Sequence, residues 1–136
     1  MNISTKYNFK NETNFSKATV DEMNFEQIQK NTVEKLYCRA QREVCDWGSF
    51  SKVSEEFSEP DGKKIFKLYI TPSPDNKKPT TRILQMSAES PFSTTFFSAD
   101  ILRGTKDDIL KFLSDENNLK QISGYAALLS QRIDQE

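Results

Sequence analysis

Residues 53–70, VSEEFSEPDGKKIFKLYI, decide the fold of this chain because they contain a complete β-hairpin signal. Apolar residues occupy most of the alternating positions on both sides of a turn, and a period of two is typical of strands with one buried face. The alternating positions are Val53, Glu55 and Phe57 before the turn and Phe66, Leu68 and Ile70 after it. Between them, Pro60-Asp61-Gly62 is a strong turn sequence. The stretch therefore predicts two antiparallel strands.

Two more strands follow the hairpin. A loop with prolines at 72, 74 and 79 is unsuited to regular pairing, and alternation resumes at about residues 80–87. Pro91 separates this third strand from a fourth at about residues 94–102. Four strands joined by short links predict an antiparallel meander.

Helical periodicity flanks this sheet on both sides. Residues 19–45 carry apolar side chains near the 3.6-residue period, until Trp47-Gly48 breaks the pattern. After the sheet, Thr105 and Asp108 stand at the spacing of a capping pair, and a second stripe runs through Leu119 to Ile133. Gly124 inside that stripe allows a bend or the close approach of another helix.

We therefore expect an α+β fold with a long N-terminal helix, a four-stranded antiparallel sheet (meander) and two C-terminal helices. We expect residues 1–19 to form a polar N-terminal arm that is mobile or loosely docked, and residues 20–136 to form a single α+β domain. A chain of 136 residues is long enough for one core and not for two.

The amino-acid composition excludes several classes of catalytic and binding site. The chain has no histidine, which rules out a Ser-His-Asp or Cys-His arrangement and an ordinary zinc site. Its four glycines are scattered singly, whereas a phosphate-binding loop needs clustered glycines. We therefore expect no enzyme activity, no catalytic residue, no metal and no cofactor.

Net charge and hydropathy indicate which classes of partner and which cellular location to expect. The net charge of −1 lacks the basic excess of a general nucleic-acid binder. The chain shows neither a secretory signal nor an apolar run long enough to span a bilayer, so we expect a cytoplasmic protein without membrane contact.

The two cysteines, Cys38 and Cys45, are seven residues apart in the predicted first helix. Two helical turns place them about 10 Å apart, which is too far for a disulfide. We expect two small, buried apolar side chains.

The densest acidic group lies beside the predicted turn and consists of Glu55, Glu56, Glu59 and Asp61. It reads as a solvated face, as an acidic patch that recognises a partner, or as a carboxylate pair for acid-base chemistry. The lone Trp47 and Tyr69 on the hairpin are further candidate partner-binding residues, since aromatic side chains are common interface anchors.

In size, charge and layout the chain is similar to small bacterial immunity proteins, and this analogy implies a protein that neutralises a toxin by binding. The leading hypothesis is a non-catalytic protein-binding module of inhibitor or immunity type, whose partner is another protein such as a toxin. The alternative is a type III secreted effector or secretion chaperone, because residues 1–19 resemble a polar secretion leader. Type III secretion chaperones interleave helices and strands, however, whereas the predicted order here is four strands and then two helices. A small carboxylate-based hydrolase is the second alternative.

Overall fold

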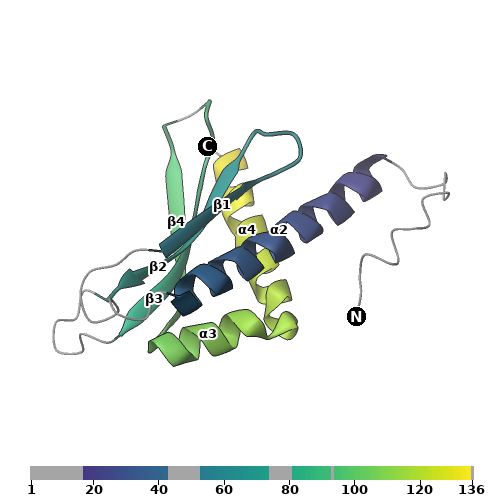
Figure 1. Ribbon diagram of the computed structural model, residues 1–136. Coiled ribbons are helices and arrows are strands. Elements are labelled where there is room, and N and C mark those ends of the chain that lie inside the picture. Colours follow the sequence, from purple (N-terminus) through teal and green to yellow (C-terminus); the bar gives the residue numbers. More distant parts are fainter. Residues whose placement is uncertain (1–16, 43–52, 74–80, 93, 136) are drawn as a thin grey trace.

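The computed structural model describes residues 17–42, 53–73, 81–92 and 94–135. The chain forms a long helix α2 (Lys17–Arg42), four strands, a second helix α3 (Lys106–Ser114) and a third helix α4 (Leu119–Asp134). A short 3-10 turn, η2 (Glu116–Asn118), links α3 to α4. Figure 1 shows this order, in which α2 precedes the four strands and α3 and α4 follow them. The predicted α+β fold is confirmed.

The four strands are neighbours in the sheet in the order in which they occur in the chain, and every pair is antiparallel. Their bounds are β1 Val53–Ser58, β2 Ile65–Pro72, β3 Arg82–Glu89 and β4 Phe96–Gly104. The last two strands begin and end two residues later than the alternation predicts. Glu89 pairs with Ile65 of β2 and with Phe96 of β4, so the ladder continues up to Ser90-Pro91. Pairing with neighbouring strands therefore sets the end of β3 and the start of β4.

The β1–β2 turn has the conformation that its sequence predicts. Gly62 adopts a φ of 71°, in the left-handed region that a side chain disfavours, and its amide donates to the Glu59 carbonyl at 2.8 Å. The amide of Lys63 donates to Asp61 Oδ1 at 2.9 Å. Asp61 therefore stabilises the turn with its own carboxylate.

Helix α2 packs on β1 and β2, and its buried stripe includes Val33, Leu36 and Ala40. The helix begins at Lys17, so the last three residues of the predicted 1–19 arm are helical, while residues 1–16 lie outside the described residues. The prediction of a buried Cys38 is wrong, because this thiol is free and exposed. Its position, two residues after Leu36, is about 200° around the helix from that buried side chain. Cys45 lies outside the described residues.

Helix α3 begins with the predicted capping pair. The Asp108 amide donates to Thr105 Oγ1 at 3.2 Å, and the Thr105 amide donates to Asp108 Oδ2 at 3.0 Å, which completes a capping box. Helix α4 buries four residues at the predicted spacing, Ile122, Ala126, Leu129 and Ile133. At Gly124 no atom lies within 4 Å of where a Cβ would stand, so no close helix contact requires this glycine.

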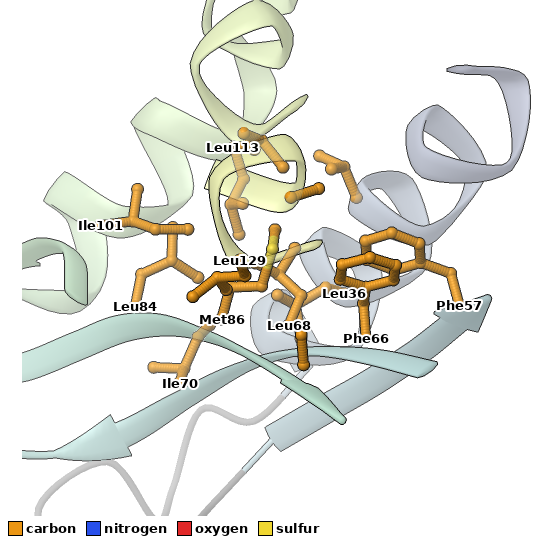
Figure 2. Close-up of a cluster of buried hydrophobic side chains, with 14 of the residues drawn as sticks. Leu36, Phe57, Phe66, Leu68, Ile70, Leu84, Met86, Ile101, Leu113 and Leu129 are labelled. Atoms are coloured by element: carbon orange, nitrogen blue, oxygen red, sulfur yellow. The ribbon is translucent and has the colours of Figure 1, made fainter. Parts of the chain in front are cut away.

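The core lies between one face of the sheet and the three helices. In Figure 2 the side chains of Phe66, Leu68 and Met86 point from the strands toward those of Leu36 and Leu129 on the helices. The rings of Phe57 and Phe66 stack with centroids 5.0 Å apart, and such a pair contributes about 0.5–1.5 kcal/mol beyond burial. Helices α2, α3 and α4 therefore cover the same face of the sheet.

Candidate functional site

The first predicted site residue, Glu55, lies on the helix-covered face of the sheet. Val53 and Phe57 on either side of it are buried in the core, and Glu55 shares their face by strand alternation. Its Oε2 lies 2.6 Å from Arg39 Nη2 of α2. Glu55 therefore joins the first helix to the edge strand.

Glu56 and Tyr69 lie on the opposite, outer face of the sheet. Glu56 is exposed, and its Oε2 is 3.8 Å from Lys67 Nζ on the neighbouring strand. Tyr69 lies in register with Gln85, which is paired in turn with Asp100. Partial burial and, secondarily, the Asp100 carboxylate raise the pKa of the Tyr69 phenol. This face has no helix over it among the described elements.

Glu59 lies at the far end of the hairpin, against the C-terminal part of α4. Ser130 Oγ donates to Glu59 Oε2 at 3.4 Å, and Lys64 Nζ donates to Ser130 Oγ at 2.6 Å and pairs with Asp134 Oδ1 at 2.8 Å. Burial raises the pKa of Glu59 more than the nearby Lys64 charge lowers it. The network joins the hairpin to α4.

The Lys64–Ser130 contact brings together the two residue types of a serine–lysine pair. In a catalytic pair of this kind the lysine accepts the serine proton. Here Lys64 Nζ donates to Ser130 Oγ and is also paired with Asp134 Oδ1, so the contact links the β1–β2 hairpin to α4.

The four carboxylates do not form one patch. Glu55 faces α2, Glu56 faces outward, Glu59 contacts Ser130 of α4, and Asp61 stabilises the turn. Trp47 lies outside the described residues. Of the four carboxylates, Glu59 and Asp61 lie at one surface hollow, whereas Glu55 and Glu56 point to opposite faces of the sheet.

A hollow at the hairpin end brings Glu59 and Asp61 near the tip of the β3–β4 hairpin. It encloses about 690 Å³ and is lined mainly by charged and polar side chains, together with Phe92 and Ile133. The Phe92 ring is 82% exposed. The lining of this hollow is less apolar than that of the groove between the helices.

A groove with an apolar floor lies between α2 and the α3–α4 junction, and α2 and α3 are neighbouring helices in Figure 1. Its volume is about 440 Å³, within the range of about 300–1,000 Å³ typical of ligand pockets. Helix α2 contributes Lys30, Val33, Glu34, Tyr37 and Cys38. The facing wall consists of Leu113, Ser114, Asp115, Glu116, Leu119 and Ile122.

The floor of the groove continues the hydrophobic core. Val33, Leu113 and Ile122 are buried, while Tyr37 and Leu119 are half-buried and present their remaining surface to the groove. Water in contact with these side chains can be displaced by an apolar ligand, and about 25 cal/mol is gained per Å² of apolar surface covered.

The rim of the groove is charged and mostly acidic. Lys30 Nζ lies 3.1 Å from Glu116 Oε1 across the two walls, and hydrogen bonding and charge from Lys30 lower the pKa of Glu116. Asp115 Oδ1 accepts from the Asn117 amide at 2.9 Å, which caps η2. With Glu34, the charged residues that line the groove are three carboxylates and one lysine.

The chemistry available in this groove is that of binding. Aliphatic and aromatic side chains form its floor, and carboxylates at the rim can receive a cation. Among the described residues, no three potential ligands for a metal ion stand together. Within the same part of the chain, no helix combines the length and apolarity that a bilayer crossing needs.

None of the residues that line the groove was among the site residues predicted from the sequence. A weak signal was present, since Tyr37, about 100° around the helix from Leu36, widens the apolar side of α2 beyond the stripe through Leu36 and Ala40. A second signal was the polar run 114–118, which separates two apolar helices and leaves a junction to be covered. Comparison with protein-family models, with curated proteins and with solved structures finds no match for this chain.

Proposed function

We propose that this chain is a non-catalytic protein-binding module of inhibitor or immunity type, and that it holds its partner in the groove between α2 and the α3–α4 junction. The groove itself carries the proposal: an apolar floor of core side chains opens to the surface inside an acidic rim. Interfaces have the same organisation, with an apolar centre and a charged margin.

Two features of the groove favour a macromolecular partner. Tyr37 is half-buried at its wall, and tyrosine is enriched among residues that dominate binding energy. The rim carboxylates of Glu34, Asp115 and Glu116 accelerate association with a basic surface. An inhibitor that neutralises a basic toxin or enzyme needs both properties.

The test is capture of a partner from the native host with the groove open and with it filled. Cys38 is exposed at the groove, so Cys38→Trp places a large side chain there without entering the core. Leu128→Lys is the control, because Leu128 is 49% exposed on α4 and does not line the groove. Each variant is checked for folding by circular dichroism and captured proteins are quantified by mass spectrometry.

We expect a stoichiometric protein partner with the wild type and with Leu128→Lys, and at least a tenfold lower recovery with Cys38→Trp. Recovery of no stoichiometric partner would refute the proposal. Equal recovery with the filled groove would refute this site.

A further inference from the structure

Building on this proposed function, we infer that the segment held in the groove is an amphipathic α-helix with lysine or arginine beside its apolar stripe. Three observations carry this inference: the helical walls, the spacing of the apolar side chains on the floor, and the charge of the rim.

The walls select a helix over an extended segment. Both sides of the groove are helical, α2 on one and α3, η2 and α4 on the other, so an extended ligand meets no strand edge with which to pair. Its backbone amides and carbonyls would lie unpaired against Val33, Leu113 and Leu119. A helix satisfies its own backbone and packs its side chains between those of the two walls.

The floor sets the apolar pattern of the ligand. Residues Val33 and Tyr37 follow one another at a spacing of four on α2, with Leu119 and Ile122 on the facing wall. A helix lying along this groove presents residues i, i+3, i+4 and i+7 to it. The cavity of about 440 Å³ is large enough for a few such side chains, not for a whole domain.

The rim sets the charge of the ligand. Lys30 is already paired with Glu116, which leaves Glu34 and Asp115 to face a ligand. A lysine or arginine next to the apolar stripe can reach these carboxylates, whereas a glutamate or aspartate there is repelled.

The experiment is a selection of ligands by the full chain carrying Cys45→Ser, which leaves Cys38 as its one thiol. The probe is a phage-displayed library of 16-residue peptides with equal numbers of helical, extended and proline-rich frames, and with acidic and basic flanks in equal number. Enriched peptides are synthesised, and their affinity for the chain is measured by fluorescence polarisation. Circular dichroism measures their helicity on binding. The rate at which a maleimide modifies Cys38 reports whether the groove is covered.

We expect enrichment of helical frames with apolar residues at i, i+3, i+4 and i+7 and basic flanks, and at least a tenfold slower modification of Cys38 in the complex. Glu34→Lys should weaken binding about tenfold. Glu26→Lys, which makes the same charge change at an exposed position of α2 outside the groove, should leave affinity within about twofold.

The outcomes separate this inference from the proposed function. Enriched peptides that cover Cys38 but are extended or acidic overturn the helical or basic character and leave the groove as a protein-binding site. The inference is overturned if no peptide is enriched, or if the enriched peptides leave Cys38 reactive. Partner capture with Cys38→Trp then tests the proposed function separately. Concentration-dependent protection of Cys38 without peptide shows that a second copy covers the groove, which also overturns the inference.

Discussion

At the residue scale, the neighbours Glu55 and Glu56 show how strand alternation assigns different roles to identical side chains. Glu55 pairs with Arg39 at 2.6 Å on the helix-covered face, and Glu56 points to solvent. Because the Glu55 carboxylate is only 16% exposed, its interaction is screened less than that of an exposed pair.

We therefore predict that Glu55→Gln lowers the free energy of unfolding by about 0.5–1 kcal/mol, while Glu56→Gln changes it by less than about 0.3 kcal/mol. Urea denaturation at low and high salt measures both, and the Glu55 effect should shrink as salt rises. Equal effects of the two substitutions would contradict the placement of the pair across α2 and β1.

Two carboxylates should contribute to pH dependence with opposite signs. Burial raises the pKa of Glu59, so the folded chain holds that proton more tightly than the unfolded chain does, and stability is lost as pH rises through the folded pKa. Hydrogen bonds with Thr105 lower the pKa of Asp108, so its stabilisation is present above the unfolded pKa and is lost as pH falls through the folded pKa.

The corresponding variants are Glu59→Gln and Asp108→Asn, compared with the wild type at about pH 3 and about pH 7, on either side of the ordinary range of these groups. The melting temperature of Glu59→Gln, taken relative to that of the wild type, should be higher at the higher pH than at the lower pH. The melting temperature of Asp108→Asn, taken relative to that of the wild type, should be lower at the higher pH than at the lower pH. Calorimetry on the three proteins tests both, and shifts of the same sign would refute the assigned environments.

At the element scale, local sequence predicted the helices and strands because their signals are local. The capping pair Thr105 and Asp108, the turn at Pro60-Asp61-Gly62 and the alternation in β1 and β2 all appear as their spacing predicts. The observed ends of β3 and β4 lie two residues later than predicted, because pairing with neighbouring strands determines where each strand ends. The exposed Cys38 was missed because apolar character alone does not give direction around a helix.

The two glycines with open space around them provide a matched pair at this scale. Gly62→Ala should lower the free energy of unfolding by about 1 kcal/mol, since its φ of 71° is disfavoured for alanine. Gly124→Ala should raise it by about 0.5–1 kcal/mol, because the helix gains propensity and the added methyl group meets nothing within 4 Å. Chemical denaturation measures both, and destabilisation by Gly124→Ala would contradict the open surface on α4.

At the scale of the whole molecule, the site could not be predicted from sequence because it is a product of packing. The carboxylates at 55, 56, 59 and 61 are close in sequence, and the fold distributes them over two sheet faces and the turn. The groove joins α2 to residues more than seventy positions later, at the α3–α4 junction. Tertiary arrangement of helices therefore decides which surface is apolar and concave.

The most direct measurement of the central claim is chemical-shift mapping of the isotopically labelled full chain during titration with its captured partner. Binding in the groove predicts that the perturbed amides concentrate in residues 30–38 of α2 and 113–122 of the α3–α4 junction. Perturbations confined to residues 55–61 of the hairpin, or to Lys67 and Tyr69 on the outer face, would contradict it.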